Sequence, residues 1–283
     1  MTGRQIPHSC EDRMKLDRFG LYEKAMPDSF TVQGKLELAG RIGYDWMEIS
    51  IDESEAKQKR LFDIGLQKEI GKAVETTGVP IESICLSAHR KYPLGEPDEN
   101  NLIILRAAVD LAVRLGIRMI QLAGYDTYYN PSTEETRNLF FENLKRSVDY
   151  AASRGVALGF ETMETDFMNT VGKAMVYVNR VGSPYLGVYP DIGNISNATP
   201  DPVADILSGR GHIIAAHLKE TKPGIFRDME FGNGAVDFKH CVEALHQIGV
   251  HRFTTEFWYD GKTEPEEYVR RNFAYVQKVF AGA

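Results

Sequence analysis

The 283-residue sequence predicts a single-domain (β/α)8 TIM barrel. Short apolar runs alternate with longer stretches of helical period from residue 19 to the end of the chain, which is the pattern of repeated βα units. Eight such runs occur, so each unit has about 35 residues, close to what one unit of this barrel needs. No linker rich in Pro, Gly or Ser divides the chain, and we expect residues 19–283 to form one domain.

Each predicted strand is short and rich in Ile, Val, Leu, Phe or Tyr, the residues that favour strands. In chain order the eight predicted strands are Phe19–Ala25, Asp45–Ile51, Ser83–His89, Met119–Tyr125, Val156–Met163, Leu186–Asp191, His212–Lys219 and Phe253–Tyr259.

The stretches between these strands are amphipathic and predict helices. In Asn101–Leu115 apolar residues recur every three or four positions, and Thr133–Ser153 follows a predicted capping box of Ser132 with Glu135. Glycines recur two to seven residues before the strands, where a left-handed helix end favours them. They are Gly43, Gly78, Gly116, Gly155, Gly182, Gly211 and Gly249.

The N-terminus differs from the rest. Residues 1–18 carry seven charged side chains in place of the apolar centre of a signal peptide, and we expect a polar extension there. A doubly wound nucleotide-binding sheet is the weaker alternative fold. It needs a glycine-rich loop after the first strand, whereas residues 22–27 read Tyr-Glu-Lys-Ala-Met-Pro.

Charge and cysteine content exclude several classes of partner. With 33 Lys and Arg against 40 Asp and Glu, the net charge of −7 argues against nucleic acid or an anionic membrane as the main partner. No apolar run approaches the roughly 18 residues of a membrane span. Cys10, Cys85 and Cys241 are odd in number and far apart, so we expect neither disulfides nor a thiolate zinc site, and a cytoplasmic location.

Four ionisable residues lie at or near the ends of successive predicted strands. Glu161, Asp191, His217 and Glu256 belong to the fifth, sixth, seventh and eighth strands. Singly, each is explained by a salt bridge, a helix cap or a satisfied core histidine. Together they would meet at the C-terminal face of the barrel, where active sites lie. Burying three carboxylates around one imidazole is prohibitive unless a cation compensates them, so the set predicts a divalent metal site.

The donor set limits the metal and the chemistry. Three carboxylates and one imidazole suit Mn²⁺, Mg²⁺ or Co²⁺ and admit Zn²⁺. Such an ion would stabilise an enediolate formed beside a carbonyl. Glu161 and Glu256, on strands separated around the ring, could stand on opposite faces of a sugar, which inversion of a stereocentre requires.

Several longer segments resemble the xylose-isomerase-like barrels, and more closely the L-xylulose-5-phosphate (L-ribulose-5-phosphate) 3-epimerases. The similarity runs from about Phe19 to the C-terminus. The segments that carry it are Gly20–Ala25, Cys85–Arg90, Ile120–Asp126, Tyr189–Asn194 and His217–Gly224. The resemblance implies that Glu161, Asp191, His217 and Glu256 bind the metal, that Glu161 and Glu256 are also the acid/base pair, and that the protein is a homodimer.

The sequence departs from the family's pattern at Asn194. Ketose epimerases of free sugars commonly carry a histidine there, three residues after the metal-binding aspartate. Asparagine can still form a hydrogen bond with a substrate hydroxyl, but it cannot titrate, so the handling of the substrate at this position is expected to differ.

Further substrate contacts are expected around this face. Lys222 is the first candidate for the phosphate, with Lys219 and Arg227 behind it, because loops after the last two strands often hold one in this fold. The alternative is that Lys222 is a solvated charge and Lys219 a partner of Glu220. The basic group His89, Arg90 and Lys91 is a competing phosphate site.

Polar and aromatic residues complete the expected pocket. Glu48 and Gln121 are expected to bind hydroxyls or orient metal ligands, or else to belong to barrel packing. Tyr22 and Trp258 are candidate walls for the sugar, whereas Phe257 is more typical of core.

The sequence therefore predicts a metal-assisted 3-epimerase that acts on L-xylulose 5-phosphate and L-ribulose 5-phosphate. An aldose–ketose isomerase, for example of hexulose 6-phosphate, or a 3-epimerase of another ketose, are the nearest alternatives. The DNA-repair endonucleases of similar fold bind zinc through many histidines, whereas this chain has seven His and a negative charge. A sugar-phosphate sensor would not need both Glu161 and Glu256.

Overall fold

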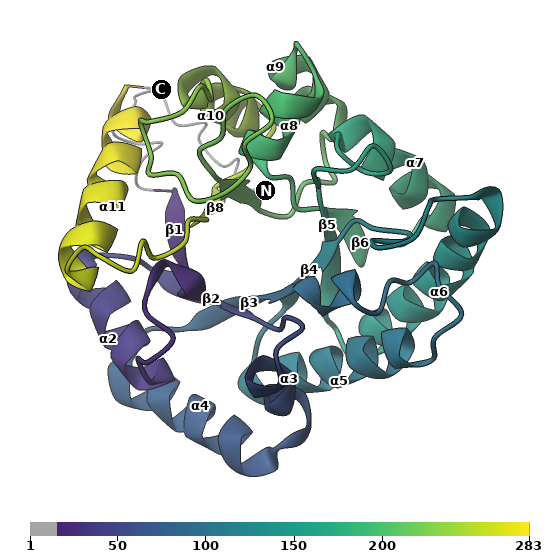
Figure 1. Cartoon of the computed structure of the whole chain (residues 1–283), viewed down its shortest axis with the longest axis horizontal. Coiled ribbons are helices and arrows are strands. Elements are labelled where there is room, and N and C mark those ends of the chain that lie inside the picture. The colour runs from purple at the N-terminus through teal and green to yellow at the C-terminus, as the bar shows by residue number, and fades with distance from the viewer. Residues whose placement is uncertain (1–15, 283) are drawn as a thin grey trace, which may run out of the picture.

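The computed structural model describes residues 16–282 as a ring of eight parallel strands surrounded by helices, a TIM barrel (Figure 1). The strands are β1 (Arg18–Tyr22), β2 (Trp46–Ser50), β3 (Ile81–Leu86), β4 (Met119–Ala123), β5 (Ala157–Glu161), β6 (Leu186–Val188), β7 (Ala216–Leu218) and β8 (Arg252–Thr255). The α-helices of the described residues are α2 (Val32–Ile42), α3 (Glu55–Phe62), α4 (Ile64–Thr77), α5 (Asn100–Leu115), α6 (Glu134–Ser153), α7 (Val171–Val181), α8 (Ile192–Ala198), α9 (Pro202–Ser208), α10 (Phe238–Gln247) and α11 (Pro265–Ala281).

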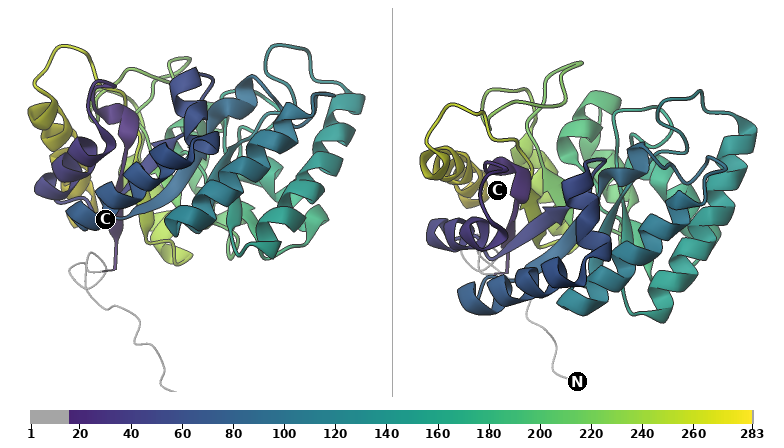
Figure 2. Two further views of the ribbon diagram at one scale, coloured as in Figure 1. Left: turned by 90° about the horizontal axis from the view of Figure 1, so that it is seen from below. Right: turned by 60° about the horizontal axis from the view of Figure 1, so that its bottom comes forward.

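The strand order confirms the predicted barrel and shows where it closes. Neighbouring strands pair in the order β6-β5-β4-β3-β2-β1-β8-β7. Between β6 and β7 only the isolated bridges Val188↔Ile213 and Asp191↔His217 complete the ring. We call this join the β6–β7 seam. Figure 2 shows that loops project from one edge of the barrel, while β1 begins at the opposite edge.

The predicted glycines explain how the helices end. All seven have a positive φ, the conformation that costs glycine least, and Gly43, Gly78, Gly116 and Gly182 are left-handed C-caps. Gly20 has a different role inside the barrel. A Cβ there would lie 2.5 Å from the Trp46 ring, so only glycine allows this ring to fill the bottom of the core.

Several predicted boundaries were wrong by a few residues. The seventh strand is limited to Ala216–Leu218, because residues 212–214 meet β6 only through bridging hydrogen bonds. The capping box of α6 is formed by Thr133 and Thr136, whereas the Ser132 hydroxyl donates to Asp126. Asp17 is buried and Arg18 begins β1, so both belong to the barrel rather than to the predicted extension; residues 1–15 of that extension lie outside the described residues.

A buried group of charged side chains surrounds Glu23, in the short 3-10 helix η1 (Glu23–Ala25) directly after β1. Arg60 donates from both terminal nitrogens to the Glu23 oxygens, at 2.5 and 2.9 Å, and Lys57 lies 2.9 Å away. Lys35 lies 3.8 Å from the carboxylate and donates to the Glu23 carbonyl. Ser50 completes the shell with its amide and hydroxyl. We call these five residues the Glu23 cluster.

No helix in the described part of the chain is long and apolar enough to cross a membrane.

Candidate active site

Four candidate ligands meet at the C-terminal end of the barrel, as the sequence predicts. Glu161 ends β5, Asp191 follows β6, His217 lies in β7 and Glu256 directly follows β8. One ligand atom from each lies within 4.8 Å of the others. Asp191 and His217 are fully buried, and Glu161 and Glu256 are each 4% exposed. Parallel strands bring their carboxyl ends to one edge, which is why residues up to 95 positions apart converge.

Asp191 is held by the helix that it starts. It is the N-cap of α8, and its Oδ1 accepts the Asn194 amide at 2.8 Å, so it is both the helix cap and a member of the cluster. The adjacent Gly193 leaves no room for a side chain, because a Cβ there would lie 2.6 Å from the Lys219 carbonyl oxygen. This close approach sets the carboxylate against the end of β7.

His217 is oriented from across the barrel by Glu48. The His217 Nε2 lies 2.7 Å from Glu48 Oε1, while Nδ1 lies 3.2 Å from Glu256 Oε2 and 3.6 Å from Glu161 Oε1. Glu48 is in turn bound by the Ser83 hydroxyl and by the Tyr189 hydroxyl at 3.1 Å. Glu48 therefore fixes the ring so that Nδ1 faces the carboxylates.

Lys219 is the residue of this cluster whose position the sequence analysis missed. Its Nζ lies 2.7 Å from Asp191 Oδ2 and 3.4 Å from Glu256 Oε2, and the side chain is buried. The interpretation of Lys219 as a partner of Glu220 is wrong, since Glu220 instead accepts backbone amides of Thr221, Gly232 and Val236. A signal was available in the sequence. Lys219 is the last residue of the predicted strand His212–Lys219, whose C-terminal end was expected to meet the carboxylates.

The charges shift the pKa values of the cluster in opposite directions. Burial raises the pKa of Asp191 to about 8. The nearby Lys219 lowers this pKa in part, and repulsion from Glu256 raises it further. Burial alone would raise the pKa of Glu256, but Lys219 and His217 outweigh it and hold that pKa well below its usual range. Burial alone would lower the pKa of His217, but Glu48 and Glu256 outweigh it and raise that pKa.

The donor set fits a divalent cation. The carboxylates of Glu48, Glu161, Asp191 and Glu256 outnumber the cationic groups even when the imidazole is protonated. A buried excess of negative charge is unfavourable until a cation joins it. Three carboxylate oxygens and one imidazole nitrogen are ligands that such ions accept, so the cluster is able to bind a metal.

Gln121 and Asn194 border the cluster. Gln121 Nε2 donates to Glu161 Oε2, which leaves Glu161 Oε1 facing His217. Asn194 Nδ2 donates to the Thr162 carbonyl at 2.7 Å, and its Oδ1 has no partner among the described residues. Both side chains are buried, so each has one polar atom left to bind a ligand.

The predicted phosphate contacts are not gathered in one place. Lys222 is exposed in the loop after β7, where its backbone pairs with Ile225. His89 was predicted in the third strand but lies in the 3-10 helix η2 (Ser87–Arg90), buried, with Nε2 3.3 Å from the Asn101 carbonyl. Burial lowers the pKa of His89 to about 4, so this imidazole adds no charge to a basic site at neutral pH.

Aromatic side chains surround the cluster. The ring of Tyr189 packs edge-on against His217 at 4.9 Å, and Tyr22 packs edge-on against Trp258 at 6.0 Å. Phe257 is 1% exposed and contacts Phe231, so its interpretation as core is confirmed.

Comparisons with known proteins find relatives that cover nearly the whole chain. A family model described as xylose isomerase-like TIM barrel matches residues 36–279. An L-ribulose-5-phosphate 3-epimerase UlaE from Salmonella typhimurium is 41% identical over 290 residues, which span 100% of this chain and 98% of the relative.

Solved structures of ketose 3-epimerases share the fold. A D-psicose 3-epimerase from Clostridium cellulolyticum H10 superposes with a TM-score of 0.79 at 15% identity, covering 93% of this chain and 99% of that one. A D-allulose 3-epimerase from a Methylomonas species has a TM-score of 0.73 at 19% identity, covering 92% and 96% of the two chains.

Proposed function

The chain belongs to the xylose isomerase-like TIM barrel family, and from this premise we propose that it is an epimerase that interconverts L-ribulose 5-phosphate and L-xylulose 5-phosphate. The two sugars differ only in configuration at C3. The reaction therefore removes the C3 proton and returns a proton to the opposite face of the resulting enediolate. The observation that carries the proposal is the convergence of Glu161, Asp191, His217 and Glu256 within 4.8 Å, in a chain 41% identical to a named epimerase of this substrate.

Glu161 and Glu256 are the proposed acid/base pair. They come from β5 and β8, so two carboxylates approach a substrate at the cluster from different sides of the ring. Lys219 and His217 hold the pKa of Glu256 low, which keeps this carboxylate ionised, the form that a base requires. Gln121 holds one oxygen of Glu161 and leaves the other free.

A metal completes the proposed site. Glu161, Asp191, His217 and Glu256 would hold one divalent cation, Mn²⁺, Mg²⁺, Co²⁺ or Zn²⁺, and this cation would supply a Lewis acid for the carbonyl next to C3. Glu48 keeps the His217 ring in place for this role, and Asn194 Oδ1 is placed to accept a hydrogen bond from a sugar hydroxyl.

Proton exchange at C3 tests the reaction. In D₂O the protein supplied with metal is expected to convert L-ribulose 5-phosphate to L-xylulose 5-phosphate that carries deuterium at C3. Proton NMR monitors the conversion. Deuterium at C1 together with an aldose would instead identify an aldose–ketose isomerase. Absence of any exchange would favour a binding protein.

The phosphate is proposed to bind Lys222, with Arg90 as the competitor. The Lys222 side chain is exposed and has no hydrogen-bond or ion-pair partner within residues 16–282. The Arg90 guanidinium, by contrast, already lies over the rings of Tyr125 and Tyr128, at 5.9 and 5.8 Å. Lys222→Met is expected to raise KM about tenfold or more with little change in kcat, because a charge-assisted contact contributes about 1.5–3 kcal/mol. Lys278→Met on the exposed side of α11 is the control. A rise in KM in Arg90→Met alone would move the phosphate to the other side of the barrel.

A further inference from the structure

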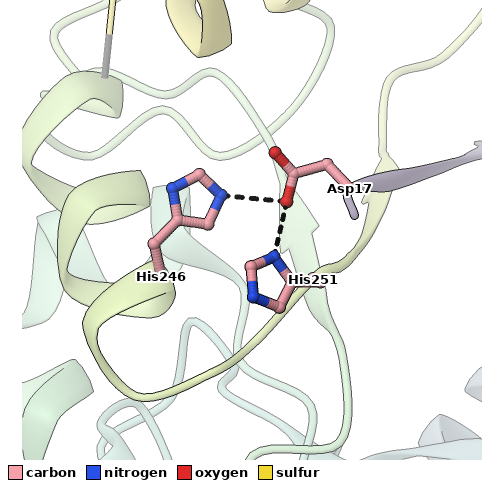
Figure 3. A group of neighbouring side chains, drawn as sticks. All are labelled: Asp17, His246 and His251. Carbon is pink, nitrogen blue, oxygen red and sulfur yellow. Dashed lines mark hydrogen bonds and ion pairs between the residues drawn. The ribbon is translucent and has the colours of Figure 1, made fainter. Parts of the chain in front are cut away.

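A second group of metal-ligating side chains lies at the other end of the barrel. Asp17 precedes β1, His246 lies near the end of α10, and His251 precedes β8 (Figure 3). Both imidazoles point toward the same carboxylate oxygen. The His246 Nε2 lies 3.0 Å and the His251 Nδ1 lies 2.8 Å from Asp17 Oδ1. The two rings also stack, with centroids 5.3 Å apart.

The carboxylate of this group is buried and incompletely satisfied. The Asp17 side chain is fully buried, and its Oδ2 has no hydrogen-bond partner among the described residues. His246 is 4% exposed, and its Nδ1 also has no partner in that part of the chain. A buried carboxylate oxygen without a hydrogen-bond partner is energetically costly, so the Asp17 side chain can gain from a bound cation. The Asp237–His240 pair at the start of α10 differs, because both side chains are exposed and the pair has one imidazole.

The separations of the ligand atoms are close to those found around one ion. Two neighbouring ligands bound at about 2.0–2.2 Å to an octahedral or tetrahedral ion lie roughly 2.8–3.6 Å apart. The two imidazole nitrogens lie 3.0 and 2.8 Å from Asp17 Oδ1, and all three atoms lie within 4.8 Å of one another. Four residues separate His246 from His251, a spacing common among zinc-binding histidine pairs. Two imidazole nitrogens with one carboxylate suit Zn²⁺ and Co²⁺, and the His251 side chain is 27% exposed, which leaves access for a water ligand.

We propose that Asp17, His246 and His251 form a second divalent-metal site, which takes Zn²⁺ or Co²⁺ and is separate from the active site. His251 and Glu256 lie at opposite ends of β8, so about 16 Å of strand separates the two sites. The ion would join the start of β1 to the segment between α10 and β8, next to the β1–β8 pairing. Its role is structural, because the site lies at the N-terminal end of the barrel strands, whereas active sites of this fold lie at the C-terminal end.

Metal stoichiometry of the whole protein tests the site. Protein freed of metal by a chelator is titrated with Co²⁺, and binding is measured by calorimetry and by visible absorption. We expect the protein to bind two equivalents of Co²⁺. His217→Asn is expected to lose the active-site equivalent and to keep the other. His251→Asn is expected to lose the other equivalent while epimerase activity is retained, so failure of this proposal and failure of the proposed function are distinguishable.

The matched control is His240→Asn, which removes an exposed imidazole of α10 that also faces an aspartate. It is expected to bind two equivalents. Asp17→Asn provides a second variant if His251→Asn does not fold, as judged by circular dichroism. The proposal is overturned if the wild-type protein binds no Co²⁺, or if no equivalent is lost in Asp17→Asn or in folded His251→Asn. A single equivalent that is lost in His251→Asn and kept in His217→Asn would instead overturn the metal of the proposed active site.

Discussion

Two buried groups of charged residues lie at the C-terminal ends of the strands, and they are balanced in opposite ways. In the Glu23 cluster one carboxylate faces three cationic side chains, and two of these contact it at 2.9 Å or less. In the active-site cluster three carboxylates share one lysine and one imidazole, and Glu48 adds a fourth carboxylate behind the imidazole.

The difference separates a structural ion pair from a binding site. Burial alone would raise the pKa of Glu23, but Arg60 and Lys57 outweigh it and hold that pKa well below its usual range. At the active site the pKa of Asp191 remains raised, to about 8, despite the neighbouring Lys219. The ionised form of Asp191 therefore stays unfavourable after folding and can gain from an added cation, whereas Glu23 already has its cationic partners.

The largest expected effect is on catalysis. Glu161→Gln should lower kcat for L-ribulose 5-phosphate at least about 10³-fold, because it removes both a base and a metal ligand. The free energy of unfolding of the metal-free protein should not fall, since the change relieves excess negative charge. Exchange at C3 by NMR and urea unfolding measure the two quantities. Activity above a tenth of the wild type would refute the assigned role.

The matching change in the Glu23 cluster should have the reverse outcome. Glu23→Gln leaves Arg60, Lys57 and Lys35 buried without their carboxylate, and should lower the free energy of unfolding by about 3–5 kcal/mol. Urea unfolding is the measurement. If Glu23→Gln instead abolishes turnover while stability is unchanged, the cluster belongs to the active site.

The pH dependence of the metal-free protein should reveal the unbalanced cluster. Because the folded pKa of Asp191 is above the unfolded value of 3.8, the folded state binds the extra proton, and its stabilising effect is lost as pH rises toward 8. The raised pKa of His217 extends this loss above pH 6.5, while the lowered pKa of Glu256 acts only below about 4.5.

Metal should reverse this trend. The rise in melting temperature caused by added Mn²⁺ should therefore grow between pH 5 and 8, since metal binding displaces the same protons. Thermal melts with and without chelator measure it. The Glu161→Gln variant is the control in which the metal effect is reduced. A metal effect that is constant over this range would contradict the assignment.

The smallest effects should come from single lysines. Lys219→Met removes the nearest ammonium of the acidic cluster and should lower the stability of the metal-free protein by about 2 kcal/mol at pH 8. Lys57→Met leaves Glu23 with its two-point contact to Arg60 and should cost about 1 kcal/mol. Denaturant unfolding at pH 8 compares them. An equal loss in both variants would mean that the two clusters are balanced alike.

Much of the barrel was predictable because its signals are local. The period of the apolar residues and the positions of the glycines identify each strand and helix. The four candidate ligands stand out because each lies in or shortly after a strand, near its C-terminal end. The contact between His217 and Glu48 joins residues 169 positions apart and depends on which way each side chain points into the barrel. The same holds for Lys219, whose partners could equally have been residues of its own loop.

The β6–β7 seam links assembly of the ring to occupation of its centre. Three backbone hydrogen bonds join the strands, from Val188 to His212, from Ile214 to Val188 and from His217 to Pro190. The last of these joins the proposed ligand His217 to Pro190, the residue directly before the proposed ligand Asp191. An ion bound by both Asp191 and His217 would crosslink β6 and β7, where two isolated bridges complete the ring among the described residues. When the ion is removed, the backbone amides of the β6–β7 seam should then be the first to exchange with solvent. Local unfolding of the barrel would begin at the metal site.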